Sequence, residues 1–469
     1  MMLRRFGGFA AAALVLAHPA LAQDRPDQKA FFGLYKELVE TDTALSKGDC
    51  TKAAAQIATR MKAAGYADAD LTAFSVPEHP REGGLVAMLK GSDAKAKPML
   101  LLAHLDVVEA KRADWERDPF TLVEEGGYLY GRGTVDDKAQ AAIWADTMIR
   151  LKREGFRPKR TIKLALTCGE ETTYAWNGAE WLAKNRPELI AAEFVFNEGG
   201  GGRIDAQGKR QLLALQVGEK AAQNFTFVAT NPGGHSSQPT PDNAIYELAD
   251  ATKAVQGYRF PVKFTETTRA FFTKSAAASP EPLAGAIRRL LADPNDAAAD
   301  AIVSRDKTMN STLRTSCVAT LLNAGHAENA LPQRATANIN CRIFPGETVE
   351  TTLAKLQELA GPKVQVTANQ PVRPLAKPTP LDPRIVKPIE ALAAKHFPGV
   401  PVLPIMSTGA TDGIFLQAIG MPVYGVPGTF IDADMNGVHG LNERIRVASL
   451  YDGRDYLHDL VKDFANRIW

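Results

Sequence analysis

Two apolar runs that lack polar alternation constrain the fold of this chain more than any other feature. "PMLLLAHLDVV" occupies residues 98–108 and "TIKLALT" occupies residues 161–167. Between them, "DDKAQAAIWADTMIRLKREG" has helical spacing from Asp136 to Gly155, and a further helical pattern runs over residues 31–64. Strands that are apolar on both faces and alternate with helices are typical of a sheet covered on both sides. The sequence therefore predicts an α/β domain with a mixed, mostly parallel sheet.

The pattern changes near Lys220. "AQNFTFVAT" (residues 222–230) alternates like a strand of a half-exposed sheet, and a helical segment follows at 243–255. Strands at 315–325 and 334–344, a helix at 348–360 and a strand at 363–369 complete the order βαββαβ, which predicts a two-layer α+β domain. We expect this inserted domain at residues 220–369, with an Ala-rich helical insertion at about 258–310. The main domain would then comprise residues 23–219 and 370–469.

The first 22 residues have the composition of an export signal. Arg4 and Arg5 precede a short apolar stretch that ends in Ala20-Leu21-Ala22, the pattern of a secretory signal peptide and its cleavage site. We expect a mature chain that starts near Gln23 and is periplasmic or secreted from a bacterium. The formal net charge of +2 gives no indication of nucleic acid or an anionic membrane surface as partner, and no later segment is apolar enough to cross a membrane.

Acidic and histidine side chains follow the predicted strands or lie in the turns between elements. The set comprises His104, Asp106, Asp136, Glu170, Glu171, Glu198 and His439. The carboxyl ends of the strands in an open α/β sheet meet in one crevice, where so many carboxylates repel one another unless positive charge is present. Imidazole and carboxylate ligands suit zinc. The sequence therefore predicts two zinc ions per chain, for which cobalt or manganese can substitute.

The motifs "AHLDVV", "GRGTVDDK", "TCGEE", "FNEGG", "GGHSS" and "GVHGLNER" occur in this order along the chain. In that order they resemble the di-zinc metallopeptidase family of glutamate carboxypeptidase, aminoacylase, acetylornithine deacetylase and carboxypeptidase S. The likeness covers nearly the whole mature chain, and "LRTSCVATLLNAGHAENALPQRATANINCRIFPGE" makes it strongest for the carboxypeptidase S-like branch. Two positions depart from the family pattern, because Gly169 and Asn340 stand where acids are common.

The resemblance implies how five of these residues would hold the metal ions. His104 and Glu198 would bind one zinc ion, and Glu171 and His439 would bind the other. Asp136 would bridge the two ions. The three carboxylates in this set would balance most of the charge of two zinc ions.

The resemblance also implies catalytic and substrate-binding residues. Glu170 would be the general base, and Asp106 would orient His104 by accepting its second ring N–H. The residues that would contact substrate or line the site are His235, Asn329, Arg342, Gly409, Thr411 and Asp412. Of these, Asn329 and Arg342 would bind a free carboxylate of the substrate. In dimeric members of the family, the residue that matches His235 reaches the neighbouring subunit's site and stabilises the oxyanion.

The function implied is zinc-dependent hydrolysis of an amide bond in a small peptide or N-acyl amino acid that carries a free carboxylate, of the carboxypeptidase or dipeptidase type. An N-acyl amino acid deacylase (aminoacylase) is an alternative, because the ligands and the bond that breaks are the same. A secreted binding protein without catalysis is a further alternative, although a binder would need no general base at Glu170. The inserted domain would act as a lid and as the surface of a homodimer.

The four cysteines form no CxxC pair, so a zinc ribbon is not indicated. Cys317 and Cys341 lie on two predicted strands that flank a turn near Glu328 and Asn329. Antiparallel pairing about that turn would place the two cysteines nearly opposite each other. The sequence thus predicts either a Cys317–Cys341 disulfide or two unlinked neighbours on adjacent strands.

Overall fold

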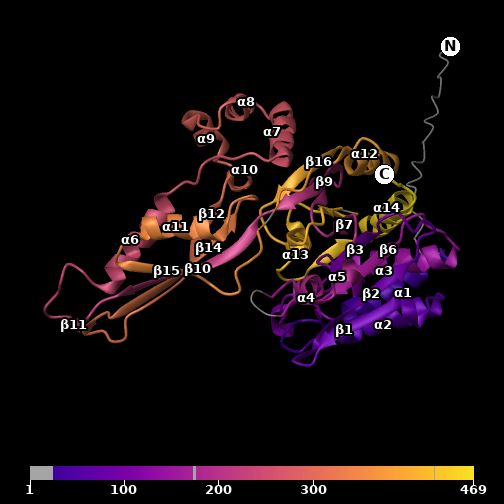
Figure 1. The fold of residues 1–469 in the computed structure, drawn as a ribbon, viewed down its shortest axis with the longest axis horizontal. Coiled ribbons are helices and arrows are strands. Elements are labelled where there is room, and N and C mark those ends of the chain that lie inside the picture. The colour runs from indigo at the N-terminus through magenta and orange to yellow at the C-terminus, as the bar shows by residue number, and fades with distance from the viewer. Residues whose placement is uncertain (1–24, 173–175, 376, 427) are drawn as a thin grey trace, which may run out of the picture.

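A computed structural model of the protein describes residues 25–172, 176–375, 377–426 and 428–469. The signal peptide predicted at residues 1–22 lies outside the described residues. Figure 1 shows a large body built around a twisted sheet and an elongated body that extends from one side of it. Within the described ranges, no helix is both long and apolar enough to span a bilayer.

The large body, the main domain, contains segments from both ends of the chain. Its helices are α1 (Pro26–Glu40), α2 (Cys50–Ala63), α3 (Lys138–Arg153), α4 (Gly178–Asn185), α5 (Pro187–Ile190), α12 (Pro383–His396), α13 (Gly413–Ala418) and α14 (Val447–Ala465). Its strands are β1 (Leu71–Val76), β2 (His79–Leu89), β3 (Met99–His104), β4 (Val123–Glu125), β5 (Tyr128–Tyr130), β6 (Ile162–Thr167), β7 (Phe194–Asn197), β8 (Gly201–Ile204), β9 (Arg210–Glu219), β16 (Val402–Ser407), β17 (Val423–Gly425), β18 (Phe430–Ile431) and β19 (Arg444–Arg446).

The elongated body, the inserted domain, lies between β9 and α12 in the chain. Its strands are β10 (Ala221–Thr230), β11 (Gly234–His235), β12 (Ser316–Ala324), β13 (Ala330–Leu331), β14 (Arg334–Ile343) and β15 (Val364–Ala368). Its helices are α6 (Ala244–Gly257) and α11 (Val349–Ala360). The helical insertion between α6 and β12 consists of α7 (Glu266–Ala278), α8 (Leu283–Ala292), α9 (Ala297–Val303) and α10 (Lys307–Leu313).

The main domain is organised by a ten-stranded sheet in the order β1-β2-β6-β3-β7-β17-β9-β8-β18, with β16 beside β9. Its central strands β6, β3, β7 and β17 run parallel, which confirms the predicted α/β class. Every residue of β3 and β6 is buried, because helices cover both faces. Along β3, Met99 and Leu101 join the core under α1, α3 and α14, whereas Leu100 and Leu102 join the core under α4 and α13. Burial on both faces explains the uninterrupted apolar run.

The helical pattern predicted over residues 31–64 forms two helices rather than one. α1 ends at Glu40, and α2 begins at Cys50 after the N-cap Asp49, whose side chain accepts a hydrogen bond from the Lys52 amide at 2.8 Å. Between the helices, Thr43 Oγ1 donates to the Leu105 carbonyl at 2.7 Å. An aspartate at this position satisfies a free amide of the new helix, so Asp49 was the sequence signal for the break.

The inserted domain consists of a four-stranded sheet in the order β12-β14-β10-β15, with α6 and α11 packed on one face. The predicted βαββαβ order is thereby confirmed. Strand β10 buries Phe225 and Phe227 against the helices and turns Asn224 and Thr226 to the open face, which accounts for its alternating sequence. Lys220 alone separates the end of β9 in the main sheet from the start of β10.

The helical insertion packs on the main domain, although it interrupts the inserted domain in sequence. Helices α7 to α10 enclose a small core around Phe272, Ile287 and Leu290. Helix α7 lies next to β16 (Figure 1), and Lys274 Nζ on this helix donates to the Val402 carbonyl at 2.9 Å. The insertion therefore forms a bridge between the two bodies.

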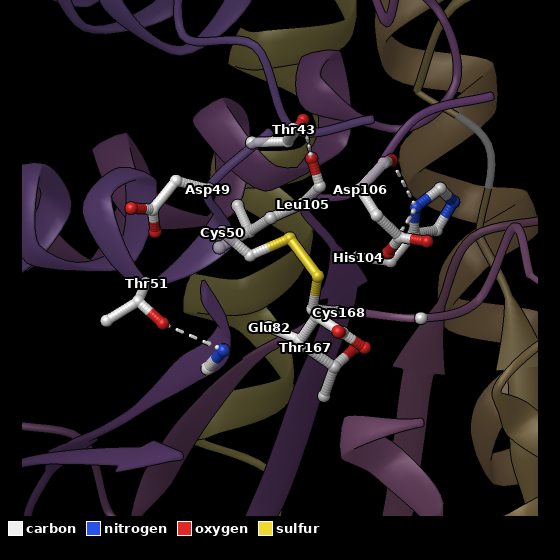
Figure 2. The surroundings of a disulfide bond; sticks show 12 residues. Thr43, Asp49, Cys50, Thr51, Glu82, His104, Leu105, Asp106, Thr167 and Cys168 are labelled. Atoms are coloured by element: carbon white, nitrogen blue, oxygen red, sulfur yellow. Dashed lines mark hydrogen bonds and ion pairs between the residues drawn. A yellow bond between two sulfur atoms is a disulfide. The ribbon is translucent and has the colours of Figure 1, made fainter. Parts of the chain in front are cut away.

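Two disulfides crosslink the described residues. Cys317–Cys341 joins β12 to β14 at positions that are direct partners in the strand register, as the sequence predicted, and the structure has the disulfide rather than the unlinked alternative. Cys50–Cys168, which the sequence did not predict, joins the start of α2 to the residue after β6. Figure 2 shows this second bond next to the segment that holds His104 and Asp106. Because Glu170 follows Cys168 by two residues, the bond anchors the segment that carries the predicted general base.

We predict that replacing both Cys50 and Cys168 by alanine lowers the free energy of unfolding by about 5 kcal/mol, because that bond closes a loop of 118 residues. The matched control replaces Cys317 and Cys341 by alanine, where the loop spans 24 residues and the expected loss is about 3 kcal/mol. Equilibrium denaturation without reductant measures the free energy of unfolding of both variants and of the unmutated protein. A smaller loss for the Cys50–Cys168 variant than for the control would contradict the loop-length explanation.

Candidate active site

The predicted metal ligands follow neighbouring strands of the main sheet. His104 is the last residue of β3, Glu170 and Glu171 follow β6, and Glu198 follows β7. Strands β6, β3 and β7 are parallel neighbours, so their carboxyl ends share one edge of the sheet. At that edge the chain leaves the sheet, and polar side chains can converge on a ligand.

Asp136 and His439 reach the same edge from two loops. His439 Nε2 lies 3.2 Å from Asp136 Oδ2 and 2.9 Å from Glu171 Oε2. His104 Nε2 lies 3.2 Å from Asp136 Oδ1 and 3.7 Å from Glu198 Oε1. The two oxygens of Asp136 therefore face the two histidines, which is the arrangement expected of a bridging ligand.

Glu170, Glu198 and the two histidines at this edge have strongly perturbed pKa values. Burial raises the pKa of Glu170 and of Glu198 well above the ordinary value, and neighbouring carboxylates raise both further. Burial opposes protonation of His104, but the surrounding carboxylates raise its pKa well above the ordinary value. Hydrogen bonds to Asp136 and Glu171 raise the pKa of His439 to about 10. Each shift reduces excess negative charge, which is also what a bound cation would do.

The donor set at this edge fits divalent metal ions. Two groups have donor atoms that all lie within 4.8 Å of one another: His104 with Asp136 and Glu171, and His104 with Glu170 and Glu198. Imidazole nitrogen and carboxylate oxygen are the donors that zinc and similar ions accept in proteins. The two overlapping groups share His104, so the edge offers ligands for more than a single ion.

Asp106 supports this site through its backbone and its side chain (Figure 2). Its carbonyl oxygen accepts a hydrogen bond from His104 Nδ1 at 3.0 Å, and its Oδ1 lies 3.6 Å from the same nitrogen. Its Oδ2 accepts a hydrogen bond from the Glu171 amide at 2.9 Å. His104 Nδ1 donates the proton in this hydrogen bond. The other ring nitrogen, Nε2, faces Asp136 and Glu198 and is free to bind a metal ion. The Asp106 carboxylate itself holds the backbone of Glu171.

A cavity of about 240 Å³ lies between the two domains, beside the acidic cluster. The main domain lines it with Glu170, Glu171, Asn177, Ala410, Thr411, Asp412, Ile414, Phe415 and His439, and residues of or next to the inserted domain add Ala222, Asn224, Asn340, Arg342 and Arg373. Arg342 interacts electrostatically with Glu170, which opposes the lowering of the arginine pKa by burial. The structure thus brings the predicted base and the predicted carboxylate-binding arginine into one cavity.

Gly409, Thr411 and Asp412 belong to the loop between β16 and α13. Asp412 accepts hydrogen bonds from Thr167 Oγ1 at 2.9 Å and from Asn177 Nδ2 at 2.6 Å, and burial raises its pKa to about 6. These bonds fix the loop to β6 and to the start of α4. Thr411 and Asp412 line the cavity. Gly409 does not line it, although the next residue, Ala410, does.

His235 and Asn329 lie apart from this cavity within one chain. His235 belongs to β11, which pairs with β13 at the far tip of the inserted domain (Figure 1). The Ser236 amide donates to the Asn329 carbonyl at 3.0 Å, so the two predicted substrate residues are neighbours, and both are exposed. The structure places them together but not with Arg342.

The sequence analysis did not predict two residues that line the cavity, although the alternation of the strands indicated them. Asn224 and Asn340 line the cavity beside Arg342, and they are direct partners in the pairing of β10 with β14. The alternation of these strands places all three side chains on the open face of the sheet. The alternation of side chains along the two strands was therefore enough to predict that these three residues share one face of the sheet.

The sequence analysis also did not predict a buried ion pair behind the site. Arg132 Nη1 and Glu443 Oε2 are 2.7 Å apart. Both residues lie inside motifs that were already noted, "GRGTVDDK" around Asp136 and "GVHGLNER" around His439. No local pattern shows that these two motifs meet.

Comparison with known proteins agrees with this geometry. Residues 100–463 match Peptidase family M20/M25/M40. The human N-fatty-acyl-amino acid synthase/hydrolase PM20D1 is 28% identical over 403 residues, which cover 84% of this chain and 79% of the human protein. The Probable carboxypeptidase S-like 2 of Dictyostelium discoideum is 27% identical over 394 residues, which cover 81% of this chain and 74% of that protein.

Solved structures share the same architecture. The M20 family metallo-carboxypeptidase Sso-CP2 from Sulfolobus solfataricus superposes with a TM-score of 0.71 at 18% identity, covering 93% of this chain and 99% of that one. The YXEP protein of Bacillus subtilis, a dinuclear metal binding peptidase, superposes with a TM-score of 0.58 at 13% identity, covering 94% and 98%. With a family match over most of its length and a shared fold, this chain belongs to Peptidase family M20/M25/M40.

Proposed function

We propose that this protein hydrolyses an amide bond in small peptides or N-acyl amino acids that carry a free carboxylate, as a zinc-dependent carboxypeptidase or dipeptidase. The observation that carries the proposal is one cavity, beside the histidine–carboxylate cluster, that is lined by Glu170 and by the guanidinium of Arg342. The cluster and the base suit amide hydrolysis, and the planar guanidinium suits a carboxylate.

Five side chains would hold two zinc ions. His104 and Glu198 would bind one ion, Glu171 and His439 the other, and Asp136 would bind both, in agreement with the contacts of its two oxygens. Cobalt and manganese accept the same donor types and can substitute. When bound, the ions polarise the substrate carbonyl and lower the pKa of water.

Glu170 would move the proton in this reaction. Its carboxylate takes a proton from water as the water oxygen bonds to the amide carbon, and it delivers that proton to the nitrogen as the C–N bond breaks. Burial raises the pKa of Glu170, and a raised pKa makes its carboxylate a stronger base. Asp106 keeps Glu171 and His104 in place during both transfers through the hydrogen bonds described above.

Arg342 would bind the free carboxylate of the substrate. It lies on β14 at the open face of the inserted sheet, and Arg373 adds a second guanidinium to the same cavity. Thr411, Asp412 and Phe415 line the same cavity from the main domain. A substrate held there would place its amide between Arg342 and Glu170. The help predicted from Asn329 would have to come from a second subunit, since Asn329 lies at the far tip.

A homodimer through the inserted domain is part of this proposal. Strand β12 is an edge of the small sheet, and it exposes Val318, Leu321 and Leu322 at 58%, 70% and 63% of their surfaces. An exposed apolar edge strand is a surface on which another strand pairs. A second copy would cover these side chains, and the tip with His235 and Asn329 would then be available to the partner's cavity.

Export is proposed from residues 1–22. The disulfides Cys50–Cys168 and Cys317–Cys341 support it, because such bonds persist in oxidising compartments such as the periplasm or the medium.

Deacylation of N-acyl amino acids is the second candidate. Ile414 and Phe415 give the cavity an apolar wall that suits an acyl group, and one relative is named an N-fatty-acyl-amino acid synthase/hydrolase. A binding protein without catalysis is less well supported, because ligand binding alone explains neither the position nor the burial of Glu170.

We predict that the zinc-loaded protein releases free amine from a dipeptide or an N-acyl amino acid in a substrate screen. Glu170→Gln should lower kcat by about 10²–10⁴-fold, because glutamine keeps the shape but cannot accept the proton. Its metal content, measured by elemental analysis, should remain that of the unmutated protein. Glu188→Gln, at an exposed carboxylate on α5, is the control. Near-normal turnover in Glu170→Gln would assign the base to another group, and no hydrolysis in either substrate class would favour the binding protein.

We predict that Arg342→Ala lowers kcat/KM by about 30-fold or more, because a buried charge pair with the substrate is lost. The control is Arg334→Ala, since Arg334 lies on the same strand and face but is exposed. The substrate and its C-terminally amidated form are assayed with both variants and the unmutated enzyme. If amidation leaves the unmutated kcat/KM unchanged, the enzyme does not recognise a free carboxylate.

We predict that active sites are shared between subunits, so that two inactive variants complement each other. His235→Ala and Glu170→Gln chains are mixed under conditions that allow subunit exchange. In a mixed dimer, the chain with intact Glu170 receives His235 from its partner, so one of its two sites is complete. A 1:1 mixture at random exchange contains about half mixed dimers, so its total activity should recover to about a quarter of the unmutated level. Light scattering reports the dimer, and Leu321→Lys should dissociate it. Absence of recovery in a proven mixed dimer would mean that His235 does not act across subunits.

A further inference from the structure

We propose that Arg132 and Glu443 are positioning residues, which fix the backbone of two metal ligands, Asp136 and His439, relative to each other. The inference rests on the proposed metal-dependent function and assigns to these two residues control over metal affinity. Both side chains are buried, with 3% and 0% of their surfaces exposed, so neither contacts bulk solvent.

Glu443 holds the loop that carries Asp136. Its Oε2 accepts hydrogen bonds from Arg132 Nη1 at 2.7 Å and from the Gly133 amide at 3.0 Å. Its Oε1 accepts hydrogen bonds from the Val135 amide at 2.8 Å and from the Asp136 amide at 3.1 Å. One carboxylate therefore accepts hydrogen bonds from three backbone amides within four consecutive residues and from a guanidinium. The last of these donors is the amide of the bridging ligand itself.

Arg132 holds the loop that carries His439. Its Nη2 donates to the Gly440 carbonyl at 2.6 Å, one residue after the histidine. The Gly131 amide donates to the Glu443 carbonyl at 3.0 Å, which adds a backbone link between the same two loops. The guanidinium also lies over the Trp115 ring, 5.0 Å from its centre, so it has little freedom to turn away. The pair thus ties together two loops that lie about three hundred positions apart in the chain.

The conformation of the His439 loop requires such a restraint. His439 has a φ of 58°, and Met435, Asn436 and Asn442 also have positive φ. Asparagine adopts this left-handed conformation readily, but Met435 and His439 adopt it at a cost that the surroundings must offset. A loop with four such residues would relax if its anchors were removed. Relaxation would move His439 Nε2 away from Asp136 and Glu171.

Glu443→Gln would replace one of the two accepting oxygens of Glu443 with an NH₂ group. Its amide NH₂ would point at backbone N–H groups or at the guanidinium, so at least one donor would face another donor and Arg132 would lose its counter-charge. The ligand side chains themselves would be unchanged. Supporting groups of this kind typically contribute 10- to 100-fold to metal affinity. We therefore expect Glu443→Gln to bind metal about 10- to 100-fold more weakly.

The test measures metal binding directly rather than turnover. Metal-free protein is prepared with a chelator and titrated with Co²⁺, whose absorption spectrum reports ligand geometry, and with Zn²⁺ in competition with a chromogenic chelator. Arg132→Lys is the second variant: it keeps the charge but lacks the fork that reaches both Glu443 and Gly440, so a smaller loss of affinity is expected. Thermal unfolding of the metal-free proteins is recorded in parallel.

The matched control is Asp146→Asn. Asp146 accepts a hydrogen bond from the buried Arg454 at 2.7 Å, joining α3 to α14, and the other carboxylates bound by Arg454 are Asp27 and Asp455 rather than predicted ligands. This variant breaks a buried arginine–carboxylate pair of the same kind. It should lower the unfolding temperature of the metal-free protein while leaving Co²⁺ and Zn²⁺ affinity and the Co²⁺ spectrum unchanged.

The outcomes separate this inference from the proposed function. If the unmutated protein binds metal and Glu443→Gln binds it equally well, the positioning role is wrong and the proposed function stands. An equal loss of affinity in Asp146→Asn would also overturn the inference, because the effect would then follow stability alone. If the unmutated protein binds neither ion, both the metal-dependent function and the inference fail. Should Glu443→Gln not fold, Arg132→Lys decides, since unchanged affinity in that variant would overturn the role of the pair.

Discussion

Repulsion among closely spaced, half-buried carboxylates is the constraint around which this molecule is arranged. Asp136, Glu170, Glu171 and Glu198 converge at one edge of the main sheet, where burial disfavours the charged forms of Glu170 and Glu198. Such a cluster disperses unless its backbone is fixed from behind. The surrounding structure supplies these attachments: the Asp106 carboxylate on the Glu171 amide, the Cys50–Cys168 bond before Glu170, and the Glu443 carboxylate under Asp136. These attachments hold the acids together from behind.

The sequence predicted those parts of the fold whose signal is local. Apolar strands without alternation predicted the covered sheet, and the carboxyl ends of β3, β6 and β7 predicted where His104, Glu170 and Glu198 would lie. Strand periods of two predicted the inserted sheet, and symmetry about a turn predicted that Cys317 lies opposite Cys341. In each case one short segment carried the whole signal, because burial on one or both faces determines its pattern.

The parts that the sequence did not predict depend on contacts between distant segments. Cys50 and Cys168 are 118 residues apart, and no periodicity relates the start of α2 to the end of β6. Arg132 and Glu443 were visible as charges inside known motifs, yet only the folded sheet brings their loops together. His235 and Asn329 were assigned by resemblance to a substrate site, but the position of the tip to which they belong follows from how the inserted domain extends from the main one.

The single-residue crossing at Lys220 has a mechanical consequence. Its buried ammonium donates to the Arg314 carbonyl at 2.6 Å, so the chain's entry into the small sheet at β10 and its re-entry at β12 are fastened at the same point. If the small sheet rotated about this point, the displacement of each residue would grow with its distance from it. Arg342 pairs with Ala222, two residues from Lys220, so it would hardly move for a given rotation. His235, at the far end of the lever, would sweep the widest arc (Figure 1). Contacts near Lys220 would therefore survive such a rotation, while contacts made by the tip would change with the angle.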